Sequence, residues 1–166
     1  MTATYTTTYT YTHTVTYLAG KLLLSLKNII LKSGLNPDKL VGGWESHERA
    51  ITTWLKSGHL QEVTIEVYRP GGSSLIGRWD LSVEYGAEAD GFWFDPDDIY
   101  YQIRKQNAWP SDCNYSIIIT NKPGRPDVAG WGPVAFSSTD GMVRQSIGTM
   151  INANGLKASA SYWRTS

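Results

Sequence analysis

The stretch KPGRPDVAGWGPVAFSSTDGMVRQSIGTMINANGLKASASYWRTS, residues 122–166, decides the fold of this chain of 166 residues. It has no helical period and few charges, and glycines divide it into short apolar pieces of strand length. The tail is too rich in apolar and aromatic side chains to be solvated: Trp131, Phe136, Met142, Ile147, Met150, Ile151, Tyr162 and Trp163. We therefore expect it to pair with strands earlier in the chain.

Residues 114–121, NYSIIITN, lie directly before this tail and are the most β-prone piece of the sequence. The run Ile117–Ile119 predicts cover on both faces, as in a strand deep inside a sheet. Two interpretations of the tail follow. It either completes the sheet and never moves, which the pattern alone favours, or it crosses over a guest peptide that adds to the sheet as a strand.

The composition indicates one soluble domain with a real core. Fifteen Lys and Arg balance fifteen Asp and Glu, which argues against direct nucleic-acid binding, because phosphate contacts need a basic excess. A single cysteine, Cys113, excludes an internal disulfide. The sequence shows neither a signal peptide nor an apolar run long enough for a membrane span, so we expect a cytoplasmic protein.

Residues 2–16 alternate Thr with Tyr, Thr or Val, a pattern that favours extended backbone. We expect an N-terminal arm over residues 1–16. It is either a partly ordered arm that ends in a short edge strand, or a handle that another protein grips.

Three helices are predicted. Thr16 caps the first, residues 17–32, which carries a wide apolar stripe and ends near Gly34. The second spans about residues 46–57. The third has Asp95 as its cap and Pro96 at its first position, points Ile99 and Ile103 inward, and ends before residues 109–110. Asp97 and Asp98 interact favourably with the helix dipole at this end, so no bound cation is needed to explain them.

Two strands, residues 62–68 and 78–85, alternate apolar and polar side chains. One face of the sheet is expected to meet the helices and the other to see water. The order of arm, helices, strands, helix, strand and tail indicates an α+β fold of antiparallel strands.

No residue pattern points to catalysis. His13, His47 and His59 lie in different predicted elements without Cys, Asp or Glu at metal-ligand spacing, so no metal is expected. Cys113 stands before a predicted core strand, where packing explains it better than nucleophilic chemistry. The glycines before Ser73 make a hairpin turn, since no phosphate-binding Lys-Ser/Thr pair follows. We expect neither an enzyme nor a cofactor.

Four motifs carry a resemblance to a known family: YTHTVTY at residues 11–17, WESHERAI at residues 44–51, GWGP at residues 130–133 and STDG at residues 138–141. In this order they resemble the bacterial HORMA domains, most of all the family-1 type of CBASS anti-phage operons. The resemblance covers essentially the whole chain.

The resemblance implies a fold and a mechanism. The fold is a HORMA domain, an antiparallel sheet backed by three helices, with a C-terminal safety belt that locks over a closure-motif peptide. The closed domain binds and activates a cGAS/DncV-like cyclic-oligonucleotide synthase (CD-NTase), and a AAA+ remodelling ATPase opens it again. The alternative is a HORMA-type adaptor that bridges other proteins, for instance in DNA repair or replication control.

Carried over onto this sequence, the resemblance divides a single HORMA domain into arm 1–16, core 17–121 and belt 122–166. Residues 156–163 are expected to dock on the strand at residues 81–85. Deletion of residues 128–166 is expected to abolish peptide capture and to leave the helical core folded.

The peptide-binding edge strand is expected to comprise Tyr115, Ser116, Ile117, Ile118, Ile119 and Thr120. The belt contributes Trp131, Phe136, Met142, Ile147, Leu156, Tyr162 and Trp163. The remodeller's handle is Thr4, Tyr5, Tyr9 and Tyr11.

Overall fold

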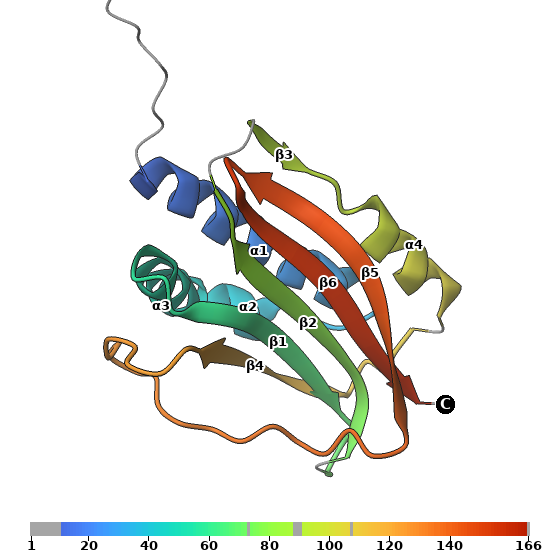
Figure 1. Cartoon of the computed structure of the whole chain (residues 1–166). Coiled ribbons are helices and arrows are strands. Elements are labelled where there is room, and N and C mark those ends of the chain that lie inside the picture. The colour runs from blue at the N-terminus through green and yellow to red at the C-terminus, as the bar shows by residue number, and fades with distance from the viewer. Residues whose placement is uncertain (1–10, 73, 88–90, 107, 166) are drawn as a thin grey trace, which may run out of the picture.

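The computed structural model describes residues 11–72, 74–87, 91–106 and 108–165. Within them, antiparallel strands form one sheet of six strands in the order β3-β5-β6-β2-β1-β4, with helices packed on one face (Figure 1). The helices are α1 Tyr11–Lys32, α2 Asp38–Gly42, α3 Trp44–Lys56 and α4 Asp97–Lys105. The strands are β1 Leu60–Tyr68, β2 Leu75–Tyr85, β3 Phe92–Phe94, β4 Asn114–Asn121, β5 Met142–Ala153 and β6 Leu156–Thr165. The predicted α+β fold is confirmed.

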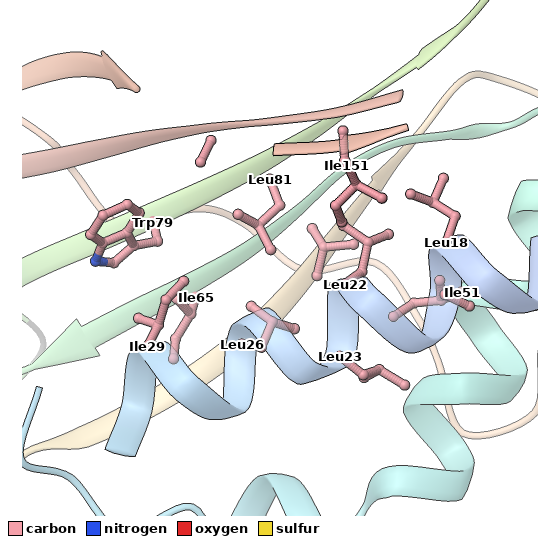
Figure 2. Close-up of a cluster of buried hydrophobic side chains, with 14 of the residues drawn as sticks. Leu18, Leu22, Leu23, Leu26, Ile29, Ile51, Ile65, Trp79, Leu81 and Ile151 are labelled. Atoms are coloured by element: carbon pink, nitrogen blue, oxygen red, sulfur yellow. The ribbon is translucent and has the colours of Figure 1, made fainter. Parts of the chain in front are cut away.

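Helix α1 forms the centre of the core. Its buried stripe of Leu18, Leu22, Leu26 and Ile29 faces β1, β2 and β5, and Leu23 points toward α3 (Figure 2). Each fully buried leucine of this kind stabilises the fold by about 1.5–3 kcal/mol. Length and composition alone would let α1 cross a membrane, but over half of its apolar 18-residue stretch is buried inside the protein.

The predicted start of the first helix is wrong. Helix α1 begins at Tyr11 rather than Tyr17, so residues 11–16 form neither an arm nor an edge strand. Thr16 is no cap, because its hydroxyl donates back to the Thr12 carbonyl at 2.8 Å inside the helix. The burial of Val15 in the core outweighs the β preference of the threonines. Residues 1–10 lie outside the described residues.

The other predicted elements are present. Strand β4 has the predicted ends, and the others are shifted by a few residues at one end or both. Helix α3 begins at Trp44. Helix α4 buries Ile99 and Ile103 as expected, but it begins at Asp97, so the cap residue is Pro96 and not the predicted Asp95. Helix α2 and strand β3 were not predicted, because five and three residues are too short to show a period. The docking of residues 156–163 is confirmed, since Leu81 pairs with Ala160 and Tyr85 with Leu156.

The expectation that the second face of the sheet sees water is wrong near the β1–β2 turn. Thr64, Glu66 and Asp80 lie on the face opposite the helices, yet all of them are buried. Trp163 of β6 donates its indole N–H to Asp80 Oδ2 at 2.9 Å. The chain between β4 and β5 contacts the same region, because the Ser137 N–H donates to Glu66 Oε2 at 2.9 Å.

Strand β4 lies at the edge of the sheet and not deep inside it, because β1 is its only neighbour among the strands of the described residues. Its register, Ile65 opposite Ile117 and Thr64 opposite Ile118, places Ile118 on the face away from the helices. Ile118 is nevertheless buried. Cover on both faces was therefore predicted correctly at Ile118, but the outer cover is not a layer of helices.

Candidate functional site

After β4 the chain does not turn back to pair with it. Residues 122–141, which we call the crossing segment, run outside β4 and past the β1–β2 turn to the far side of the sheet (Figure 1). There the chain forms the β5–β6 hairpin, the terminal hairpin, which pairs with β2. The belt predicted at residues 122–166 thus consists of two parts that lie at opposite sides of the sheet.

The first half of the crossing segment is held by α3. The Trp54 indole N–H donates to the Pro126 carbonyl at 2.7 Å, and the Arg125 guanidinium lies 5.0 Å from the centre of the Trp54 ring. The Trp131 indole N–H reaches Ser46 Oγ at 3.1 Å. Trp131 also packs edge-on against His47 and Trp54, with ring centres 5.3 and 5.9 Å apart.

A groove of about 560 Å³ lies between β4 and this segment. Its walls are residues 117–125, residues 130–134, Phe136 and Trp54. Val134 is 69% exposed and Phe136 is 40% exposed, which is high for side chains of this kind. The ionisable residues among these walls are Lys122 and Arg125, both basic.

The edge of β4 within the groove can pair with an extended chain. An edge strand presents backbone N–H and C=O groups that a further strand can pair with. Side chains of such a strand would point alternately to the two faces of the sheet. On the outer face they would meet the apolar wall of Val134 and Phe136.

The structure divides the predicted edge residues. Ile117, Ile118, Ile119 and Thr120 line the groove, but Tyr115 and Ser116 do not. Tyr115 instead ties β4 to the region around α2: its hydroxyl donates to the Asn36 carbonyl at 2.8 Å and accepts from the Leu40 N–H at 3.3 Å. Burial is the main cause that raises the pKa of Tyr115, which keeps this hydroxyl protonated.

The predicted belt residues also divide. Trp131 and Phe136 line the groove, whereas the others belong to the terminal hairpin: Met142, Ile147, Leu156, Tyr162 and Trp163. Tyr162 stacks on Trp79 with ring centres 5.0 Å apart, and its hydroxyl donates to Gln145 Oε1 at 2.9 Å. These hairpin residues hold the end of the chain in place and do not contact the groove.

Several residues that line the groove were not predicted as site residues, among them Trp54, Arg125 and Val134. Trp54 was assigned only to the core face of its helix, although its indole also holds the crossing segment. Arg125 and Val134 lie in a stretch without regular structure, where no period assigns a side chain to a wall. The aromatic Trp131 beside two glycines was the one available signal, and it was recognised.

Of the predicted handle, Thr4, Tyr5 and Tyr9 lie outside the described residues. Tyr11 is in the first turn of α1 and not in an extended arm. Its hydroxyl donates to the Leu55 carbonyl at 2.9 Å, which fixes the start of α1 against the end of α3.

The residues considered for catalysis or metal binding have structural partners. His47 Nδ1 lies 2.6 Å from the Gly43 carbonyl, and His59 Nδ1 lies 2.8 Å from Ser57 Oγ. The His13 ring packs edge-on against Phe92. Burial raises the pKa of the Cys113 thiol, which disfavours the thiolate. Within the described ranges, no three His, Cys, Asp or Glu residues come together as metal ligands.

The sequence matches the family Bacterial HORMA domain 2 over residues 2–166. The chain belongs to this family. The expected assignment to the family-1 type is thereby corrected: the short motifs identify a bacterial HORMA domain but do not separate its subfamilies. No curated protein matches the sequence.

Solved structures show the same HORMA fold. A chain of the mitotic checkpoint complex superposes with a TM-score of 0.75 at 8% identity, covering 90% of this chain and 97% of that one. The Escherichia coli MS115-1 structure of a CdnC:HORMA-deltaN complex gives 0.63 at 16% identity, covering 92% and 87%. Caenorhabditis elegans HTP-2 bound to the HIM-3 closure motif gives 0.57 at 14% identity, covering 94% and 88%.

Proposed function

We propose that this HORMA domain is a peptide-binding conformational switch of an anti-phage defence system in the cytoplasm. In its closed state it binds and activates a cGAS/DncV-like cyclic-oligonucleotide synthase, and a AAA+ ATPase opens it. The observation that carries the proposal is the groove between the edge of β4 and the crossing segment. The domain has no catalytic role of its own, needs no cofactor, and binds neither nucleic acid nor membrane.

The groove supports binding of a closure-motif peptide by strand addition. A peptide beside Ile117–Thr120 gains backbone hydrogen bonds along β4 and side-chain contacts at every second residue. Because the crossing segment passes outside the groove, a bound peptide is enclosed and leaves only when that segment moves. Slow release of this kind makes an ATP-driven opener useful.

The proposed partners follow from the likeness to bacterial HORMA complexes. Escherichia coli MS115-1 HORMA has been solved together with CdnC and Trip13, and that structure resembles this chain with a TM-score of 0.61 at 16% identity. We assign the synthase and the remodeller to this chain on that ground. The remodeller's handle is then the segment around Thr4, Tyr5 and Tyr9, without Tyr11, which is bonded to α3.

A switch must also have a small free-energy difference between its states. A ligand that shifts a population from 1:99 to 99:1 needs about 5.5 kcal/mol of preferential binding. The exposed stretch at residues 132–135 buries little surface and can move at low cost. A short peptide strand is large enough to supply most of that energy.

The decisive test uses a purified cGAS/DncV-like synthase. The purified chain is mixed with that synthase and nucleotides, with and without a peptide selected from a phage-displayed library on the purified chain. We expect cyclic oligonucleotide formation only when chain and peptide are both present. No stimulation under any condition would sink the proposal.

A second function is an adaptor that holds a peptide without activating a synthase. This chain resembles Caenorhabditis elegans HTP-2, whose named partner in the solved complex is the HIM-3 closure motif and not a synthase. That likeness favours peptide binding without activation of an enzyme. Neighbouring genes for a nucleotidyltransferase and a AAA+ protein favour the switch, and their absence favours the adaptor.

A further inference from the structure

The carboxyl group of Glu66 is completely buried, although it lies on the outer face of the sheet. Acidic side chains are almost never fully buried unless they have hydrogen-bonding partners. Since the helices lie on the opposite face, the cover must come from elsewhere. The partners of Glu66 identify that cover.

Each carboxyl oxygen of Glu66 accepts one hydrogen bond. Oε1 accepts from the Tyr68 hydroxyl at 2.6 Å, and Oε2 accepts from the backbone N–H of Ser137 at 2.9 Å. Burial, and then the bond to Glu66, raise the pKa of Tyr68, so its hydroxyl stays a donor at neutral pH. Ser137 Oγ lies 3.4 Å from the same hydroxyl.

Ser137 is where the crossing segment returns to the body of the protein. Residues 132–135 are exposed, whereas Trp131 is bonded to Ser46 on α3. Beside Ser137, Phe136 packs against the Arg78 guanidinium at 4.3 Å, and Arg78 Nε donates to Asp80 Oδ1 at 2.8 Å. The outer wall of the groove is thus a span between two fixed points, Trp131 and Ser137.

We propose that Glu66 is a positioning residue that fixes the crossing segment over the groove through the Ser137 N–H. Its effect on a bound peptide rests on the proposed function, whereas its effect on the crossing segment does not. When the segment lifts, the Ser137 bond is lost and water reaches Oε2. Glu66 therefore controls how long the segment stays closed, and with it the rate at which a peptide dissociates.

The first test needs no peptide. Hydrogen–deuterium exchange of the full chain is measured over residues 130–141 in the wild type, Glu66→Leu and Glu66→Gln. We expect exchange there to rise about tenfold in Glu66→Leu, since the acceptor is gone. In Glu66→Gln it stays within about threefold, because the amide can accept from Ser137 and donate to the Tyr68 oxygen.

Glu62→Leu is the matched control. Glu62 lies on the same face of the same strand but accepts from Ser82 Oγ at 3.1 Å and makes no hydrogen bond to the crossing segment. We expect the exchange of residues 130–141 to remain unchanged. If the exchange rate of residues 130–141 rises equally in Glu62→Leu and Glu66→Leu, the cause is a general loosening of β1, and the inference is overturned.

Ser137→Pro removes the donor from the other side. If Glu66 acts through that N–H, the double variant Glu66→Leu/Ser137→Pro exchanges no faster than the faster single variant, within about twofold. Additive effects overturn the assignment. Should Glu66→Leu fail to fold, Ser137→Pro decides alone: unchanged exchange at residues 130–136 overturns the inference.

The peptide readout comes last and uses the phage-selected peptide with a fluorescent label. We expect about tenfold faster dissociation from Glu66→Leu, with association changed by less than about twofold and near-normal values for Glu66→Gln. If no peptide is ever selected while exchange changes as expected, the proposed function fails and the role of Glu66 stands. If the peptide binds and Glu66→Leu changes neither exchange nor dissociation, the role of Glu66 is wrong.

Discussion

The two parts of the predicted belt, the crossing segment and the terminal hairpin, differ in nearly every physical respect, although they follow each other in the chain. The terminal hairpin contributes Met150, Ile151, Ala158 and Tyr162 to the main core. The crossing segment has no regular structure and is largely exposed. Only Val128 of this segment belongs to the main core, and hydrogen bonds at Pro126, Trp131 and Ser137 hold the rest. The hairpin is therefore part of the fold, whereas the crossing segment is a strap attached to it.

This difference changes which experiment can remove the belt. Deletion of residues 128–166 was expected to leave the helical core folded, but it would take away the partner strand of β2 and many core side chains. We now expect that truncation to unfold the domain. Single substitutions that separate the two parts are the better probes.

The largest effect is expected in the hairpin. Ile151→Ala leaves a cavity next to α1 (Figure 2) and should lower the free energy of unfolding by about 2–5 kcal/mol. Val134→Ala in the crossing segment should change it by less than about 0.5 kcal/mol. Chemical denaturation of both variants measures the contrast. Similar losses in the two would mean that the crossing segment is also part of the cooperative fold.

Trp131→Ala should release one anchor of the crossing segment, with a smaller loss of stability than Ile151→Ala. It removes the indole hydrogen bond to Ser46 and two ring contacts, and we expect a loss of about 1–3 kcal/mol and faster exchange in residues 126–136. Trp93→Ala is the control, because Trp93 is half-exposed on β3 at the opposite edge. Equal exchange in residues 126–136 of the two variants would contradict the anchoring role.

A pair of exposed valines tests the groove itself. Val134→Glu places a charge on the apolar wall and should weaken capture of the selected peptide about five- to tenfold, with stability nearly unchanged. Val143→Glu alters an exposed valine in the hairpin, away from the groove, and should leave capture unchanged. Fluorescence polarisation with the labelled peptide compares them. If both variants bind the peptide as the wild type does, the groove is not its site.

The smallest effect concerns pH and the outer face of β1. Burial, followed by the charge of Asp80, raises the pKa of Glu62. A carboxyl group with a raised folded-state pKa contributes stability that is fully present below its unfolded pKa and is lost as pH rises through the folded value. Glu62→Gln should therefore melt about 1–3 °C above the wild type at pH 7, a small shift because the site is partly solvated. The difference should shrink or reverse at pH 4. A pH-independent difference in melting temperature would contradict the assignment to this group.

Much of the fold was predictable because its signals are local. Examples are the leucine stripe of α1, the alternation of β1 and β2, and the cap region before α4. Each of these patterns is formed by residues that lie close to one another in the sequence. The Asn154-Gly155 pair is a further local signal, which marks the turn of the terminal hairpin. Both residues have positive φ, 52° and 98°, as a two-residue hairpin turn requires.

The candidate site was predictable only in part, since its walls come from distant pieces of the chain. The Ile run of β4 and the aromatic Trp131 could be named in advance, but Trp54 and Glu66 could not. Glu66 alternates with apolar neighbours and so has the pattern of a solvated side chain. Only the return of the chain at Ser137, seventy-one residues later, buries it.

By itself, the sequence determined the α+β class, the helices and strands with strong periods, and a C-terminal tail too apolar to remain in solvent. The tertiary structure decided that β4 is an edge, that the tail divides into a core hairpin and an exposed strap, and that an acid lies beneath the strap. The reason is physical. Periodicity reports which side of an element is apolar, whereas edges, grooves and covers depend on which distant segments lie next to each other.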